Sequence, residues 1–304
     1  MRADDTMPAP PTIDAHHHLW DLRENNYPWL EGPPFDAHFG SSDHLPRPYD
    51  LARYLEEVAK QSIVKSVHVE AGHDPSDPVR ETRWLQALAD DHGYPHGIVA
   101  FADLTAPNAR GILEAHCEFQ NMRGIRMMTM SPAQLRGTKG DVRSKMSEAD
   151  WRAGFRVLGE MGLSFDLQAP APLMSEAAEV ATAFPDNQIL LTHAGLPLDR
   201  SEEGMAAWRR GMKKMADCPN IAVKISGLPM TDWSWTVDTL RPVVLETIEI
   251  FGVDRSMFGS NFPIDGLHSS FDTLFDAYRT VISGLSAAEQ RLLFHDNAAR
   301  YYRL

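Results

Sequence analysis

Short apolar runs recur along the chain, and each is followed by a segment in which apolar residues have helical spacing. The clearest stripe is Leu51, Tyr54, Leu55 and Val58, at positions i, i+3, i+4 and i+7. The apolar runs predict eight strands, at residues 12–16, 63–70, 97–103, 124–128, 163–168, 188–193, 221–226 and 257–261. Helices are expected around Leu51 to Val58 and near residues 78–92, 107–121, 147–161, 172–184, 201–217, 235–251, 271–282 and 287–300.

Strands that alternate with helices pair in parallel through right-handed crossovers. Eight such units favour an α/β fold of the (β/α)₈ TIM-barrel type, a single domain over residues 12–304 whose extra helix at 287–300 closes the bottom or side. An open doubly wound sheet is the alternative, but it usually has a glycine-rich turn after its first strand. Residues 1–11 are expected to be a flexible leader, and residues 32–47 a long loop over the barrel mouth.

Composition narrows the class of ligand. The 304 residues carry a formal charge of −13, which argues against nucleic acid or an anionic membrane as a partner. Cys117 and Cys218 stand far apart, which excludes a disulfide framework and a cysteine zinc cage. No apolar stretch is long enough to span a membrane. We therefore expect a cytoplasmic protein that binds a small molecule, and a homo-oligomer stays possible.

Three consecutive histidines end the first predicted strand, in Asp14-Ala15-His16-His17-His18. Side chains alternate along a strand, so His16 and His18 are expected to face the barrel interior and His17 to face the other way. Neutral imidazole is the commonest metal ligand, and two of them about 7 Å apart along a strand can converge on one ion. A tag remnant or a solvated turn is the alternative, which the position after an apolar strand disfavours.

Two further strand ends carry candidate chemistry. His193 ends an apolar strand and precedes Ala194-Gly195, and Asn261 ends the eighth strand, four residues before Asp265. Catalytic groups of barrel enzymes lie at the carboxyl ends of the strands. A buried histidine satisfied by hydrogen bonds, a turn asparagine and a capping or ion-paired aspartate are the alternative interpretations.

In this order, the motifs resemble the amidohydrolase superfamily, and more closely its branch of amidohydrolase-related lactonases, over nearly the whole chain. Members of this branch open 2-pyrone-4,6-dicarboxylate and sugar-acid lactones. The segments that carry the resemblance are Ile13-Asp14-Ala15-His16 with Trp20, Tyr27-Pro28-Trp29-Leu30, Gly124-Ile125-Arg126, Phe165-Asp166-Leu167, His193-Ala194-Gly195-Leu196-Pro197, Lys224-Ile225-Ser226-Gly227-Leu228 and Asn297-Ala298-Ala299-Arg300-Tyr301.

The resemblance implies that His16, His18 and His193 form the catalytic centre and could hold one divalent metal, with Zn²⁺ the first choice. The branch is said to include metal-independent members, so a site without metal is also open. The fifth strand ends at Gln168, where metal-binding members often have histidine.

A more serious departure is Asn261, which stands where the family has its general-base aspartate. An amide cannot take a proton at neutral pH. General-base catalysis is worth roughly 10² to 10⁴ in rate, so Asp265 or a histidine is expected to compensate.

Arg126 and Lys224, at the ends of the fourth and seventh strands, are expected to bind a carboxylate or carbonyl oxygen, or else to form ordinary ion pairs. Glu70 and His73 follow the second strand and could add an acid or a ligand, or lie on the surface. Four tryptophans are candidates for the pocket, although aromatic residues more often pack: Trp20, Trp29, Trp233 and Trp235.

These residues predict a hydrolase that opens a small lactone of an organic or sugar acid, with an anionic substrate. A lyase, such as a decarboxylase or hydratase of an aromatic or unsaturated acid, is the second hypothesis. A catalytically silent binding protein is the third, because of Asn261.

Overall fold

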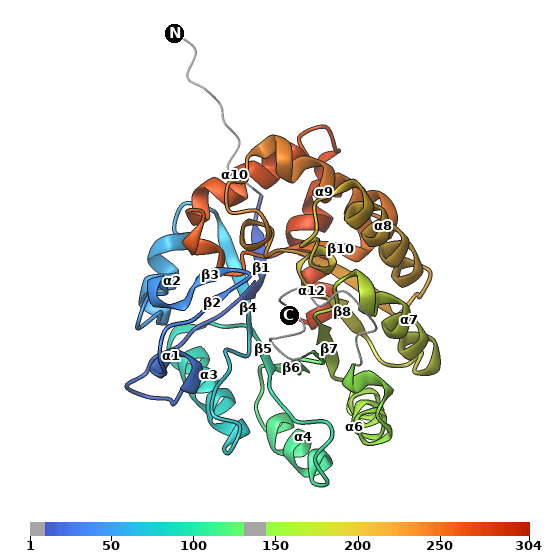
Figure 1. The fold of residues 1–304 in the computed structure, drawn as a ribbon. Helices are drawn as coiled ribbons and strands as arrows, with labels where there is room; N and C mark the ends of the chain where they lie inside the picture. Colours follow the sequence, from blue (N-terminus) through green and yellow to red (C-terminus); the bar gives the residue numbers. More distant parts are fainter. Residues whose placement is uncertain (1–9, 131–143) are drawn as a thin grey trace.

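The computed structural model of the chain describes residues 10–130 and 144–304. Eight parallel strands form one sheet, paired in the order β1-β4-β5-β6-β7-β8-β9-β10. Figure 1 shows them at the centre of the molecule, with the helices arranged outside. The strands are β1 (Thr12–His17), β4 (Ile63–Val69), β5 (Gly97–Ala100), β6 (Met122–Ile125), β7 (Ser164–Leu167), β8 (Ile189–Leu191), β9 (Ile221–Ile225) and β10 (Ser256–Phe258).

The first and last strands meet through the residues that follow β10. His17 forms an isolated parallel bridge with Phe262. The Asn261 amide N–H donates to the His16 carbonyl at 2.7 Å, and that of His18 donates to the Phe262 carbonyl at 2.8 Å. The strands therefore form a barrel, as the alternation of strands and helices predicted.

The helices that connect and cover the strands follow the predicted alternation. They are α2 (Leu51–Val58), α3 (Pro78–His92), α4 (Ala109–Cys117), α6 (Ala149–Glu160), α7 (Met174–Ala183), α8 (Glu202–Ala216), α9 (Val237–Phe251) and α10 (Phe271–Val281). The predicted helix at 287–300 is divided into α11 (Ala287–Arg291), a π-helical turn at Leu292–Asp296 and α12 (Asn297–Tyr302). A short α1 (Pro28–Glu31) precedes α2.

Two local details differ from the expectation. The fourth strand begins at Met122 rather than at residue 124, because Met122 already pairs with Ile98 of β5. The predicted loop at 32–47 contains a small antiparallel hairpin, β2 (Asp36–Ala37) and β3 (Gly40–Ser41), which is too short to leave a period-two pattern in the sequence.

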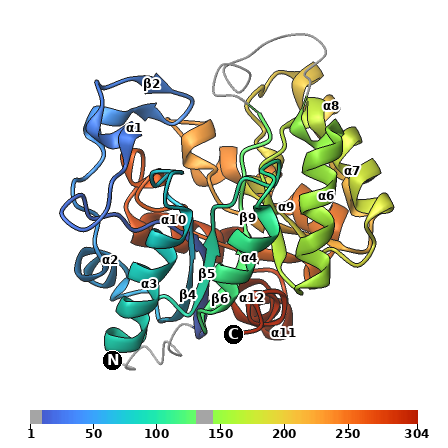
Figure 2. The same ribbon diagram turned by 90° about the horizontal axis from the view of Figure 1, so that it is seen from below.

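A layer of apolar side chains fills the barrel interior at the amino-terminal ends of the strands. Ala298 and Tyr302 of α12 pack against this layer, so the predicted extra helix closes the bottom of the barrel. Figure 2 shows α11 and α12 at one end of the molecule and α1 and β2 at the opposite end. The inward side chains of the layer are Ile13, Ala15, Val67, Val69, Val99, Leu190, Ala222 and Met257.

Residues 1–9 of the expected leader lie outside the described residues. Within residues 10–130 and 144–304, no helix combines the length and the apolar character that crossing a membrane requires.

Candidate active site

A register shift in β1 sets the direction of its histidines. The pairing of β1 with β4 is irregular between Asp14 and His17. Ile13 and Ala15 fill the barrel interior below this irregularity. Strict alternation from Ala15 would turn His17 inward, but His17 instead bonds the Ser66 hydroxyl through Nε2 at 3.0 Å and stacks on Tyr54 of α2. The irregularity thus leaves the interior side of the barrel to His16 and His18.

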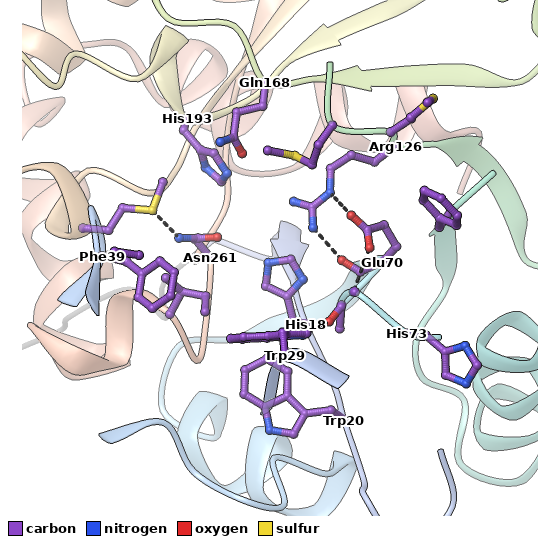
Figure 3. A pocket seen from close by; sticks show the side chains of 18 of the residues that line it. His18, Trp20, Trp29, Phe39, Glu70, His73, Arg126, Gln168, His193 and Asn261 are labelled. Atoms are coloured by element: carbon purple, nitrogen blue, oxygen red, sulfur yellow. Dashed lines mark hydrogen bonds and ion pairs between the residues drawn. The ribbon is translucent and has the colours of Figure 1, made fainter. Parts of the chain in front are cut away.

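Three imidazoles meet above the barrel core. The ring centre of His16 lies 5.1 Å from that of His18 and 4.6 Å from that of His193. His18 and His193 line the main cavity, into which Figure 3 shows their rings directed, whereas His16 is fully buried beneath them. The structure therefore brings together the three histidines that the sequence singled out.

Hydrogen bonds orient two of these rings. His18 donates from Nδ1 to the Val69 carbonyl at 2.7 Å, because a carbonyl can only accept, and its Nε2 keeps a lone pair. His193 pairs Nδ1 with the Ser226 hydroxyl at 3.0 Å, which leaves Nε2 to the cavity. Neither ring nitrogen of His16 has a hydrogen-bond partner among the described residues.

Burial keeps these imidazoles neutral. It lowers the pKa of His16, His18 and His193 well below the usual range, and nearby cationic groups add to the effect. Each ring is therefore available as a proton acceptor or a ligand at neutral pH.

Arg126 and Glu70 form an ion pair on the cavity wall. Arg126 donates from Nε to Glu70 Oε1 at 2.7 Å and from Nη2 to the Glu70 carbonyl at 2.6 Å, as the dashed lines of Figure 3 mark. Glu70 Oε2 also accepts from the Gly72 amide at 2.8 Å. The pairing fixes the guanidinium, and its Nη1 makes no hydrogen bond within the described residues.

Asn261 lines the cavity, whereas Asp265 lies behind it. Asn261 Nδ2 donates to Asp265 Oδ1 at 3.2 Å and contacts the sulfur of Met230 at 3.4 Å. Figure 3 shows the amide oxygen of Asn261 on the side of His18. Asp265 is fully buried, which raises the pKa of its carboxyl well above the usual range. It does not reach the cavity to act as the expected base.

Lys224 is fully buried below the cavity and does not line it. Its ammonium forms an ion pair with Asp166 of β7 and donates to the Ala15 carbonyl at 3.3 Å. Tyr302 of α12 donates its hydroxyl to Asp166 Oδ2 at 2.9 Å. In the function proposed for the chain, Lys224 therefore has no contact with the substrate.

The remaining candidates divide between the cavity and other surfaces. Trp20, Trp29, Gln168 and His73 line the cavity with Glu70, whereas Trp233 is 55% exposed and stacks on His268 outside it. Trp235 also lies outside, where its indole N–H donates to the His268 carbonyl. The other cavity residues follow no motif in the sequence and were not predicted individually: Phe35, Ala37, His38, Phe39, Ala71, Gly72, Pro75, Phe101, Asp103, Met127, Met128, Lys145, Met230 and Ile264.

Strained backbone is concentrated at the same place. His193, Ala194 and Asn261 have left-handed conformations, with φ values of 57°, 47° and 58°. Residues other than glycine adopt this region at a cost, and such strain collects at functional sites. Only glycine fits at position 227, because a Cβ there would lie 2.5 Å from His193 Nδ1. The local backbone is thus shaped around these side chains.

The donor chemistry of the three imidazoles suits a divalent transition metal. His16 has two buried, unpartnered nitrogens, and the Nδ1 bond of His18 is of the kind that orients a metal ligand. Within residues 10–130 and 144–304, no set of three or more His, Cys, Asp and Glu side chains has its donor atoms already gathered for a metal ion. The agreement is one of residue type alone: unpartnered imidazole nitrogens are present, but the described residues form no preassembled metal site.

Comparisons with known proteins agree with this architecture. The chain is 43% identical over 292 residues to the uncharacterized protein y4mH of Sinorhizobium fredii, covering 96% of this chain and 98% of that protein. It is 29% identical to an L-fucono-1,5-lactonase of Burkholderia multivorans, covering 96% of each. A crystal structure of an amidohydrolase from Burkholderia multivorans with bound zinc has a TM-score of 0.81 and 25% identity, covering 97% of this chain and 99% of that one.

The family model described as Amidohydrolase matches residues 13–304. This range includes all eight strands of the barrel, apart from Thr12 at the start of β1. It also includes all three clustered histidines. The chain belongs to the amidohydrolase family.

Proposed function

We propose that the chain hydrolyses the ring ester of a small lactone. The proposal is supported by the position of His18, His193 and Arg126 at the carboxyl ends of the strands, on the wall of a cavity of about 520 Å³, with His16 buried directly beneath the two histidines. Relatives named L-fucono-1,5-lactonase, at 29% and 26% identity, support a lactone as the substrate.

Arg126 positions the carbonyl group. Its Nη1 is free of described partners while Glu70 holds the other donors, so the guanidinium can donate to the carbonyl oxygen and to the oxyanion that replaces it. A preorganised donor of this kind is typically worth about 10² to 10³ in rate.

His193 serves as the base in this proposal. With Nδ1 held by Ser226, its Nε2 takes a proton from water as the water oxygen attacks the carbonyl carbon. The carbonyl oxygen of Asn261 accepts the second hydrogen of that water and orients it. The ring C–O bond then breaks, and His193 returns the proton to the leaving oxygen to give a hydroxy acid.

A divalent metal belongs to the same proposal. His16 and His18 would hold it, since His16 has two unpartnered nitrogens and His18 an oriented Nε2. When bound, it would supply Lewis-acid polarisation of the carbonyl. The zinc in the structurally similar amidohydrolase supports this choice. Metal analysis of untreated protein, with activity measured after chelation and after Zn²⁺ is restored, tests it: one ion per chain and recovery are expected.

The test of the function is a panel of lactones of different ring size and substitution, followed with a pH indicator because hydrolysis releases a proton. Turnover of at least one class is expected, with the hydroxy acid as product. A folded protein that opens none of them contradicts the proposal. Parallel measurement of carbon dioxide from aromatic acids tests the lyase hypothesis, under which only that signal appears.

A further inference from the structure

Part of the cavity wall is built of aromatic rings. The ring centres of Trp20 and Trp29 lie 5.7 Å apart, and those of Trp29 and Phe35 lie 6.3 Å apart. Phe39 continues this wall, 6.3 Å from Phe35. Figure 3 shows Trp20, Trp29 and Phe39 on the same side of His18 and Asn261. The other described residues that line the cavity include Phe101 and three methionines, Met127, Met128 and Met230.

The polar atoms of this wall are already occupied. Trp20 donates its indole N–H to the Pro46 carbonyl and Trp29 donates to the Ala71 carbonyl, both at 2.7 Å. Trp29 packs on Gly72, where a Cβ would lie 2.9 Å from the indole ring. The two indoles therefore present ring surface to a ligand and no free donor.

Such a wall disfavours a ligand rich in hydroxyl groups. A hydroxyl buried without a partner costs free energy, whereas apolar groups gain by leaving water. Each oxygen of Glu70 already accepts one hydrogen bond, which leaves this carboxylate a reduced capacity to accept hydrogen bonds from a ligand's hydroxyls. Gln168 presents an amide, but on the far side of the cavity, next to His193 and Arg126 in Figure 3.

The described charges on the lining are balanced. The described lining includes two cationic residues, Arg126 and Lys145, and two anionic residues, Glu70 and Asp103, and Arg126 is directly neutralised by Glu70 at 2.7 Å. A cavity built for a polyanionic substrate would instead carry an excess of cationic groups.

We infer that the substrate is an uncharged lactone with an apolar alkyl or aryl substituent, seated on the wall of Trp20, Trp29, Phe35 and Phe39. This inference rests on the proposed function and names its substrate class. The sequence pattern instead indicated an anionic or sugar-acid lactone, and the relatives named L-fucono-1,5-lactonase agree with a sugar-acid lactone. The cavity of about 520 Å³ leaves room for the substituent, because pockets of this size hold drug-sized ligands.

The test compares matched six-membered lactones that carry an alkyl chain, a phenyl ring, a carboxylate or several hydroxyls. We expect kcat/KM for the alkyl and phenyl compounds to exceed that for the polyhydroxylated and carboxylate compounds at least tenfold, about the discrimination that an apolar pocket gives. A preference for the polyhydroxylated or the carboxylate lactone overturns the inference and leaves the proposed function standing.

Binding of the corresponding lactams, measured by calorimetry, separates the two claims. If no lactone is hydrolysed, the proposed function fails, and the lactams still decide the inference: tighter binding of the apolar lactams supports it, and tighter binding of hydroxylated or charged lactams overturns it.

Phe39→Asn tests the wall directly. The backbone carbonyl of Phe39 holds His268 Nε2 at 2.7 Å, and this contact does not need the phenyl ring. We expect kcat/KM for the phenyl and alkyl lactones to fall about tenfold, with little change for the hydroxylated one. The matched control is Phe119→Asn, a half-buried phenylalanine away from the cavity, which should change neither. An equal effect of Phe39→Asn on all substrates contradicts a role in specificity.

Discussion

Asn261 stands between the cavity and Asp265, to which its amide donates a hydrogen bond at 3.2 Å. The carboxyl group of Asp265 is therefore buried behind Asn261, and the cavity is lined at this point by the neutral amide oxygen of Asn261 (Figure 3). In the proposed reaction, Asp265 positions Asn261 and His193 makes the proton transfers.

The first prediction concerns Asn261→Asp. If His193 is the base, a carboxylate at this position replaces no missing function, and it also faces the buried Asp265 carboxyl. We expect kcat to stay within about tenfold of the parent. A gain of roughly 10² or more, the contribution of a general base, would show that the parent lacks one. Asn261→Ala serves as the control and should lower kcat, because the attacking water loses its acceptor.

A second prediction separates the structural and catalytic parts of the Arg126–Glu70 pair. Arg126→Met leaves a carboxylate that is 7% exposed without its partner, and we expect a loss of about 3–5 kcal/mol in the free energy of unfolding, together with loss of activity. Adding Glu70→Gln removes the unpaired charge. Urea denaturation should show recovered stability in the double variant, while kcat/KM stays low. Recovery of activity would mean that Arg126 does not contact the substrate.

Lys224 provides the third prediction. Because it pairs with Asp166 away from the cavity, Lys224→Met should destabilise the fold by about 3–5 kcal/mol through the unpaired buried carboxylate. In the double variant with Asp166→Asn, the unfolding free energy should largely recover and KM should match that of the parent. A KM raised tenfold or more in the stable double variant would instead indicate that Lys224 contacts the substrate.

The fourth prediction is a pH dependence of stability at Glu81. Burial raises the pKa of this carboxyl from 4.5 to about 8. The folded state therefore binds one more proton than the unfolded state between these pH values, so this contribution is complete below about pH 4.5 and is lost as the pH rises through 8. Relative to Glu81→Gln, the parent should lose on the order of 1.4 kcal/mol per pH unit in that window. Urea denaturation at pH 5 and 8.5 measures the difference, and a value independent of pH would contradict a raised pKa.

The sequence predicted the barrel well because periodicity along the chain determines it. Alternating apolar strands and helical stripes are local signals, and the extra carboxyl-terminal helix was predicted in the same way, although only the structure decides between the bottom and the side of the barrel. The hairpin that has Phe39 in its turn has only two residues in each strand, which is too short to produce a periodic pattern in the sequence.

For the site, the sequence predicted which strand ends carry chemistry but not which side chains would pair. The clustering of His16, His18 and His193 follows from parallel strands that end at one edge. The pairing of Lys224 with Asp166, and the position of Asp265 behind Asn261, depend on depth along the barrel axis. Spacing along the chain does not encode that depth. Of the aromatic wall, the sequence indicated Trp20 and Trp29 as pocket candidates but not Phe35 and Phe39, because these two lie in a loop without a periodic pattern.

If the histidine cluster opens lactone rings, His193→Ala must impair turnover of the best lactone of the panel. We expect kcat to fall roughly 10² to 10⁴-fold, with the fold intact by circular dichroism. His92→Ala, an exposed histidine at the end of α3, should leave the rate unchanged. Equal turnover by the parent and His193→Ala would contradict the account.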